Sequence, residues 1–308
     1  MTPRPFLKWA GGKGQLLGAL RERVPSFKRY FEPFLGGGAL FFALQPKRGV
    51  LSDVNDEIIN CYKVVRDDVT ALIGALGDHR YDEDHYYEVR NTDPATLPPI
   101  ERAARTIFLN KTGFNGLYRV NRSGKFNVPF GRYAKPAICD QENLRACSEA
   151  LGDMDIKTSD FEHSAGRAEG GDFVYFDPPY VPVSRTAAFT AYAPGGFGLD
   201  AQSRLARLFA KLAGRGVKVL LSNSDVPEIR ELYASFRIET IPATRTINCK
   251  ATRRGPVSEL LVRNLDVTVA APERKSRRAP SSSRTTSGRA PSSRTSRQTS
   301  AAKVRAAS

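Results

Sequence analysis

Cysteine and histidine are scarce in this sequence, with four and three residues among 308. The cysteines form no Cys-x-x-Cys pair and have no His at metal-ligand spacing. These absences argue against a disulfide scaffold and a Cys/His metal centre, so we expect reduced thiols and no bound metal. The cysteines are Cys61, Cys139, Cys147 and Cys249. The histidines, which stand in polar sequence and are predicted to lie at the surface, are His79, His85 and His163.

Long apolar runs are also missing. The N-terminus, from Met1 to Trp9, has no apolar h-region, and nowhere do 18 apolar residues follow one another. The sequence therefore predicts neither a signal peptide nor a membrane span, and we expect a cytoplasmic protein. With 41% hydrophobic residues, the 308-residue chain is long enough for one large domain or two smaller ones.

Positive charge exceeds negative charge, and the excess is unevenly distributed. The formal net charge is +15, of which residues 272–308 contribute +9 and residues 1–271 keep about +6. The segment 271–308 is rich in Ser, Arg, Thr, Pro and Ala and has almost no large apolar residue, so we predict that it is disordered. It is either a tether for a phosphate backbone or a dispensable extension. The positive charge of both parts favours a polyanionic partner.

Short apolar, β-rich runs alternate with helical patterns, which is typical of an α/β sheet with mostly parallel strands. The expected strands are 29–34, 49–53, 172–177 and 217–222, and the expected helices are 14–23, 39–45 and 201–214. Residues 235–241 and 258–265 are predicted to close the sheet as an antiparallel pair. Ligands of such sheets bind at the carboxyl ends of the strands.

Residues from about 56 to 144 break this rhythm. Helical patterns cover 56–74 and 100–110, and residues 121–124 then form a turn signal between two β-rich runs within 114–133. We interpret this region as a second module, residues 57–144, inserted into a domain made of residues 1–56 and 145–270.

The most informative motif is Asp177-Pro-Pro-Tyr180, which ends a strand that is predicted to be buried. Two prolines stop the strand and hold the chain extended. The Asp177 carboxylate and the Pro178 carbonyl then form a pair of acceptors beside the flat ring of Tyr180. This set suits a planar base whose amino group donates two hydrogen bonds. A purely structural turn needs neither the Asp nor the Tyr.

Three further segments suggest a cofactor site, although each also has a structural explanation. Residues 34–38, Phe-Leu-Gly-Gly-Gly, let a backbone approach a ligand or simply make a tight turn. Asp53 accepts from ribose hydroxyls or caps the next helix. Trp9, the only tryptophan, either covers a cofactor or is a core residue, and Lys13 beside it could meet a carboxylate of the cofactor.

Together these motifs resemble the Dam-like family of DNA adenine (N6) methyltransferases, the D12 class. The resemblance runs from Phe6 to about Asn264, with the motifs in the family's order. They are FLKWAGGK (6–13), EPFLGGG (32–38), SDVND (52–56), FNGLYR (114–119), FNVPFGRY (126–133) and DPPY (177–180). The resemblance implies a Rossmann-like class I methyltransferase sheet that carries an inserted helical and hairpin target-recognition domain and a disordered C-terminal tail.

The resemblance also implies the reaction and its cofactor, S-adenosyl-L-methionine. The methyl group would pass to N6 of a flipped-out adenine by direct attack, without a metal or a covalent enzyme intermediate. Asp177, Pro178 and Tyr180 would be catalytic, and Lys13 would lie near the methionine carboxylate. The implied cofactor contacts are Trp9, Lys13, Phe34, Gly36, Gly38, Asp53, Asp160, Phe161 and Asp177.

Duplex DNA is the implied partner, and no membrane or obligatory protein partner is expected. Arg119 would read a guanine, and Phe114 with Asn115 would wedge into the base stack. Because these positions match the family, GATC is the implied target. The full set of implied DNA contacts is Lys8, Lys111, Phe114, Asn115, Leu117, Arg119, Pro129, Tyr133 and Arg253.

Two alternatives stay open at this point. The same reaction on a structured RNA adenine would need a different recognition module, because the inserted segment resembles DNA readers rather than RNA readers. A non-catalytic DNA-binding protein with a degenerate methyltransferase fold is the other alternative. The intact Asp53, Asp177, Pro178 and Tyr180 argue against such decay.

Overall fold

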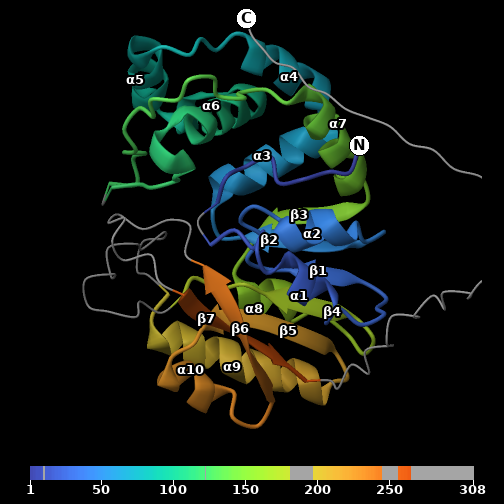
Figure 1. The fold of residues 1–308 in the computed structure, drawn as a ribbon. Coiled ribbons are helices and arrows are strands. Elements are labelled where there is room, and N and C mark those ends of the chain that lie inside the picture. Colours follow the sequence, from blue (N-terminus) through green and yellow to red (C-terminus); the bar gives the residue numbers. More distant parts are fainter. Residues whose placement is uncertain (10, 122, 181–196, 245–255, 265–308) are drawn as a thin grey trace, which may run out of the picture. The chain divides into compact units, whose positions relative to one another are not determined.

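A seven-stranded sheet lies at the centre of the computed structural model, which describes all residues except 10, 122, 181–196, 245–255 and 265–308 (Figure 1). The strands are β1 (Tyr30–Glu32), β2 (Gly49–Asp53), β3 (Met154–Thr158), β4 (Phe173–Phe176), β5 (Lys218–Ser224), β6 (Arg237–Thr244) and β7 (Pro256–Arg263). Their order is β3-β2-β1-β4-β5-β7-β6. Strands β1 to β5 are parallel, and β7 runs antiparallel to β5 and β6. The predicted α/β class and closing antiparallel pair are confirmed.

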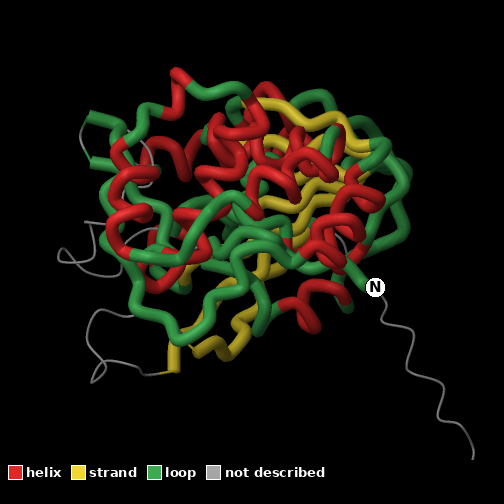
Figure 2. The backbone as a smooth tube through the Cα atoms, turned by 90° about the horizontal axis from the view of Figure 1, so that it is seen from above, coloured by secondary structure: helices red, strands yellow, loops and turns green. Residues whose placement is uncertain are grey.

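Helices cover both faces of this sheet. Strand β4 shows why, because its four side chains are all buried and point alternately to the two faces. Phe173 and Tyr175 belong to the core shared with α1, α2 and α3, and Val174 and Phe176 belong to the core shared with α8, α9 and α10. Seen from above, helices lie over much of the band of strands (Figure 2). The helices on these two faces are α1 (Leu17–Arg21), α2 (Ala39–Leu44), α3 (Asp56–Asp67), α8 (Phe161–Ala165), α9 (Leu199–Gly214) and α10 (Pro227–Leu232).

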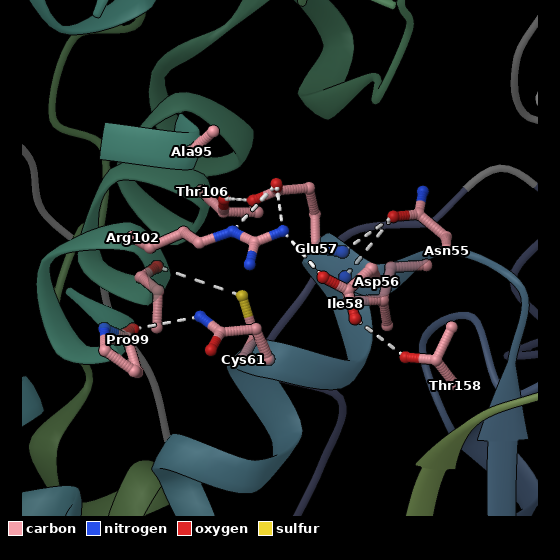
Figure 3. Close-up of polar contacts among 12 residues, drawn as sticks. Asn55, Asp56, Glu57, Ile58, Cys61, Ala95, Pro99, Arg102, Thr106 and Thr158 are labelled. Carbon is pink, nitrogen blue, oxygen red and sulfur yellow. Dashed lines mark hydrogen bonds and ion pairs between the residues drawn. The ribbon is translucent and has the colours of Figure 1, made fainter. Parts of the chain in front are cut away.

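Four more helices pack beyond α3. They are α4 (Val69–Gly77), α5 (Glu83–Asn91), α6 (Pro99–Thr112) and α7 (Gln141–Leu151). A polar clasp joins α6 to the start of α3 (Figure 3). Arg102 donates to the carboxylates of Asp56 and Glu57, each at 2.7 Å, and Thr106 donates to Glu57 at 3.1 Å. This clasp fixes the end of α3 that follows the loop after β2.

A loop-rich segment, residues 113–133, follows α6, and we call it the reading segment because the resemblance implies that it reads DNA. It begins with the 3-10 turn η2 (Phe114–Gly116), and a second such turn, η1 (Pro94–Thr96), precedes α6. The segment doubles back on itself through the isolated bridges Val120↔Phe126 and Gly113↔Phe130. A small core made chiefly by Tyr86 and Phe108, against which Phe126 and Phe130 pack, supports it. The Gly124 N–H donates to the Asn121 carbonyl at 3.0 Å, as the predicted turn requires, but the flanking runs form single bridges instead of strands.

Several expectations from the sequence need correction. The helical pattern 56–74 is two helices, because Asp68 leaves helical geometry and caps α4 through the Ala71 N–H. His79 and His85 are half-buried, with a 3.0 Å hydrogen bond between their rings, because His79 stacks on Phe108 at 4.5 Å. Only His163 is at the surface as expected. Strand β3 and helices α5, α7, α8 and α10 were not anticipated. The predicted basic tail, 271–308, lies outside the described residues.

Candidate active site and reading segment

The Asp177 carboxylate is the centre of a polar cluster at the carboxyl ends of the parallel strands. Asp177 directly follows β4, and Ser222 in the neighbouring β5 donates from Oγ to its Oδ1 at 2.9 Å. The Lys13 ammonium lies 2.8 Å from the same Oδ1 and is only 5% exposed. Both of these groups reach one oxygen, and no other described residue donates a hydrogen bond to Oδ2. Burial raises the pKa of Asp177, and the Lys13 charge opposes that rise.

The Tyr180 ring is held on two sides. Its hydroxyl donates to Glu259 Oε2 in β7 at 2.5 Å, a short distance typical of a charge-assisted bond. The Lys13 Nζ lies over the ring, 4.5 Å from its centroid, and 3.9 Å from the Glu259 carboxylate. One ammonium therefore sits between two carboxylates and one aromatic face. Burial raises the pKa of Tyr180, so its hydroxyl stays a donor.

The two proline carbonyls of the Asp177–Tyr180 turn differ in their surroundings. The Gln202 side chain donates to the Pro179 carbonyl at 3.1 Å, and Asn223 donates to Gln202 Oε1 at 3.0 Å. Both side chains are fully buried. This chain of bonds fixes the second proline by its carbonyl, whereas none of the residues that the structure describes donates to the Pro178 carbonyl beside Asp177.

The loops after β1 and β2 are joined through Asp53. Its Oδ2 accepts the Gly36 N–H at 3.1 Å, and its Oδ1 accepts the Asn55 N–H at 3.0 Å. The cap of α3 is Asn55, whose Oδ1 accepts from the first turn (Figure 3), so the capping explanation considered for Asp53 is wrong. Trp9 packs on Gly36, where a Cβ would come within 2.6 Å of the indole Cδ1. Only glycine permits that approach.

Aromatic side chains line the neighbouring loops. Phe34 stacks on Phe161 with ring centroids 5.4 Å apart, and Phe197 meets Phe34 edge-on at the same distance. Asp160 caps α8, and Arg204 approaches its carboxylate at 3.5 Å. Gly38, the last of the predicted cofactor contacts, caps α2 with a left-handed φ of 65°. Sequence reasoning missed Phe197 because it lies outside the motifs.

The reading segment presents its end to solvent. Phe114 is 51% exposed, and Asn115 beside it adopts a left-handed φ of 57°. Arg119 is exposed and donates from Nε to the side-chain oxygen of Asn127 at 2.7 Å. Pro129 is exposed and accepts the Phe114 N–H at 2.9 Å, which ties the two sides of the segment together.

The N-terminal motif reaches this segment through Lys8. Its side chain lies against Gly116, where a Cβ would come within 2.2 Å of Lys8 Cδ, and its Nζ lies 4.9 Å from the Tyr133 ring centroid. Lys111 is close enough for the Lys8 charge to help lower its pKa, after the larger effect of burial. Leu117 is half-buried. Arg253 lies outside the described residues.

The structure thus gathers the predicted residues into two groups. The cofactor and catalytic candidates lie on the loops after β1 to β4 and, for Trp9 and Lys13, in the segment before α1, and the described DNA candidates lie on the reading segment and beside it. Lys13 contacts the Asp177 carboxylate, whereas the resemblance implies that it lies near the methionine carboxylate of the cofactor. No sequence pattern predicted the contacts of Ser222, Glu259 or Gln202. The only available signal was a polar residue inside or next to an apolar run, as with Glu259 before Leu-Leu-Val.

Among the described residues, no group of three His, Cys, Asp or Glu side chains is arranged to hold a metal ion. No helix in the same part of the chain has the length and apolar character needed to cross a bilayer.

Known proteins resemble this chain over most of its length. Residues 9–247 match the family model of the D12 class N6 adenine-specific DNA methyltransferases. The chain is 45% identical over 270 residues to the type II methyltransferase M1.LlaDCHI of Lactococcus lactis subsp. cremoris, which covers 85% of this chain and 95% of that protein. It is 43% identical over 288 residues to M.MjaIII of Methanocaldococcus jannaschii, covering 86% and 100%. Identity to the DNA adenine methylase of Escherichia coli K12 is 36% over 262 residues, covering 84% and 94%.

Proposed function

The chain belongs to the D12 class of N6 adenine-specific DNA methyltransferases, and we propose that it transfers a methyl group from S-adenosyl-L-methionine to N6 of adenine within GATC in duplex DNA. Its α/β sheet, with β7 antiparallel between β5 and β6, is the class I methyltransferase fold. We propose residues 57–144 as the target-recognition insert and residues 1–56 and 145–270 as the catalytic domain.

The arrangement of Asp177 supports this proposal most strongly. Lys13 and Ser222 both reach Oδ1, and the Pro179 carbonyl is already bonded to Gln202. Asp177 Oδ2 and the Pro178 carbonyl are then two neighbouring acceptors for the two N–H bonds of an amino group. A structural turn would not need two prearranged acceptors next to a fixed aromatic ring.

The chemistry of the loops fits the cofactor. Asp53 is a carboxylate beside the Gly36 turn and suits ribose hydroxyls, and Phe34 with Phe161 suits an adenine ring. Trp9 lies on the same glycine turn. When bound, the cofactor supplies a methyl group activated on a sulfonium sulfur. Lys13 would meet the methionine carboxylate only after giving up part of its contact with Asp177.

The catalytic residues would then act by accepting hydrogen bonds from the amine and by stacking on the base. The lone pair of an aromatic amine is shared with its ring, so the amine is a poor nucleophile. Asp177 Oδ2 and the Pro178 carbonyl would direct that lone pair and stabilise the positive charge that develops on nitrogen. Tyr180, fixed through Glu259, would stack on the base and align the amine for in-line transfer.

The reading segment would supply the sequence specificity. Arg119 presents a guanidinium that Asn127 already orients, which suits a bidentate contact with guanine in the major groove. Exposed Phe114 would fill the space that a flipped adenine leaves in the stack. Lys8, Lys111 and Tyr133 would contact the backbone or flanking bases, together with Leu117, Pro129 and Asn115.

The test is base-resolution mapping of methyladenine on a plasmid from a host that has no adenine methylase of its own. We expect N6-methyladenine in GATC when the chain is expressed, and none with Asp177→Ala. Methylation at another sequence would overturn the GATC assignment alone. An unmodified plasmid, together with no labelled methyl transfer to duplex DNA in vitro, would overturn the reaction. Faster transfer to structured RNA than to duplex DNA would overturn the proposed substrate.

A further inference from the structure

Tyr118 packs against the proposed cofactor site and also adjoins Arg119 in the reading segment. Its ring centroid lies 5.3 Å from that of Trp9, which packs on Gly36. Burial raises the pKa of Tyr118, and the nearby side chain of Asn55, two residues beyond Asp53, opposes part of that rise. On its other side, its ring meets Phe126 edge-on at 5.6 Å within the reading segment. No motif assigned a role to Tyr118.

Asn55 lies near Tyr118 and is held by the helix that follows it. Its Oδ1 accepts the backbone N–H groups of Glu57 and Ile58 (Figure 3). Its backbone N–H is bonded to Asp53. A shift in the loop after β2 would therefore move a side chain that lies close to Tyr118.

The N-terminal motif is tied to the same place. The Lys8 backbone N–H donates to Asn110 Oδ1 at 2.7 Å, and the Asn110 amide donates to the Lys8 carbonyl at 2.8 Å and to the Gly116 carbonyl at 3.2 Å. Asn110 is only 1% exposed. The chain at residues 8 and 9 thus spans the start of the reading segment and the glycine turn.

We propose that Tyr118 is a positioning residue that couples cofactor binding to DNA reading. The coupling rests on the proposed function. A cofactor against Trp9 and the Asp53 loop would restrict the Trp9 ring, on which Tyr118 packs, and the loop that carries Asn55. Because Tyr118 directly precedes Arg119, holding Tyr118 in place also holds the backbone from which the Arg119 side chain projects toward guanine. Each ligand would then strengthen the binding of the other by the same factor, as linkage requires.

The test measures that factor with S-adenosyl-L-homocysteine, which carries no transferable methyl group. Its Kd is measured on the full chain alone and with saturating duplex, either containing GATC or scrambled. For the wild type we expect binding on the order of tenfold tighter with the GATC duplex and little change with the scrambled one. Tyr118→Leu keeps apolar bulk but lacks the flat ring and the hydroxyl. It should reduce the gain to less than about twofold, while the Kd without DNA stays within about twofold of the wild type.

Trp9 provides a second readout, because it is the only tryptophan in the chain. Its fluorescence should respond to the GATC duplex in the wild type and lose that response in Tyr118→Leu, while the response to S-adenosyl-L-homocysteine is kept. Tyr87→Leu is the matched control, since Tyr87 is half-buried on α5 and packs on Tyr86. It should keep the wild-type gain.

Three results would overturn the coupling role. They are equal Kd values with and without duplex in the wild type, a wild-type gain in Tyr118→Leu, and loss of S-adenosyl-L-homocysteine binding by Tyr118→Leu in the absence of DNA. The last would make Tyr118 part of the cofactor site itself. Methyl transfer by the same wild-type preparation separates the two proposals. If the wild type transfers no methyl group, the proposed function is overturned. If it does, and the GATC duplex tightens S-adenosyl-L-homocysteine binding equally in the wild type and in Tyr118→Leu, only the coupling is overturned.

Discussion

The cluster around Asp177 and the reading segment, residues 113–133, are built in opposite ways. Around Asp177, Lys13 is 5% exposed, and Asp177 and Glu259 are 20% and 21% exposed. Each of the three contacts at least one of the others or Tyr180. At the reading segment, Phe114 is 51% exposed and Arg119 is anchored mainly through Asn127.

The contrast fits the roles that we propose for the two regions. Stabilising charge that develops at one nitrogen needs donors and acceptors that are already in place, because reorienting them during the reaction costs energy. Reading a base edge needs side chains that DNA itself desolvates, so they must project into solvent beforehand. We therefore expect substitutions in the cluster to change kcat, and substitutions in the reading segment to change discrimination between sequences.

Asp177→Ala should give the largest effect. It removes the carboxylate that would accept the target amine and leaves the buried Lys13 ammonium with Glu259 as its nearest remaining carboxylate. We expect kcat to fall by at least about 10²–10³-fold, as measured by single-turnover methyl transfer. Retained binding of a GATC duplex would show that the fold persists. A fall of less than tenfold would contradict the catalytic role of Asp177.

Arg119→Ala should act on specificity instead. Loss of a bidentate guanine contact should cost about 1–3 kcal/mol of discrimination. This is roughly a 5- to 150-fold drop in the kcat/KM ratio between GATC and a duplex with that guanine replaced. The matched control is Lys125→Ala, which removes an exposed cation from the same segment. If both variants lowered kcat/KM on every duplex alike, Arg119 would be a backbone contact only.

Ser222→Ala should give a smaller effect, confined to the cluster. It removes one of the two hydrogen bonds to Asp177 Oδ1 and the partner of the Tyr175 hydroxyl at 2.9 Å. We expect kcat to fall by about tenfold, which is the lower end of the effect of losing a bond to a charged group, about 1.5–3 kcal/mol, because Lys13 keeps its contact with Oδ1. KM for DNA should stay within about twofold. Ser123→Ala, in the exposed turn of the reading segment, is the control and should leave kcat unchanged.

Mild acid should loosen the reading segment before the cluster. Burial, with a smaller effect from His85, lowers the pKa of His79 from 6.5 to about 4. Between these values the unfolded chain binds more protons than the folded one, so stability is lost as pH falls through this window. Because His79 is only half-buried, we expect a loss of about 1–2 kcal/mol. His79→Phe, which keeps a ring against Phe108, should remove that part of the pH dependence in urea unfolding.

Hydrogen exchange at pH 5 and pH 7 would localise this loss. Protection should fall in residues 113–133 more than in β4 and β5, because Phe108 packs beneath the reading segment. Equal loss in the two regions would contradict the separation between them.

Much of the fold could be read from the sequence because its signals are local. Apolar runs followed by Gly, Asp or Pro mark the ends of β1, β2 and β4, and the structure confirms them within a few residues. Strand β3 could not be predicted, because Met154–Thr158 is an edge strand with only three buried or half-buried positions. The reading segment was expected as a hairpin, yet tertiary packing on Tyr86 and Phe108 decided its shape.

The sequence by itself determined the acceptor pair and the ring of Asp177–Tyr180, because these groups are neighbours in the chain and the prolines fix their spacing. Only the tertiary structure decided which atoms stay available to a substrate. Ser222 is 45 residues from Asp177, and Glu259 is 79 residues from Tyr180. Lys13 comes from the other end of the chain. Such partners meet only when parallel strands bring their carboxyl ends to one edge, and their order in the sheet is set by packing on both faces.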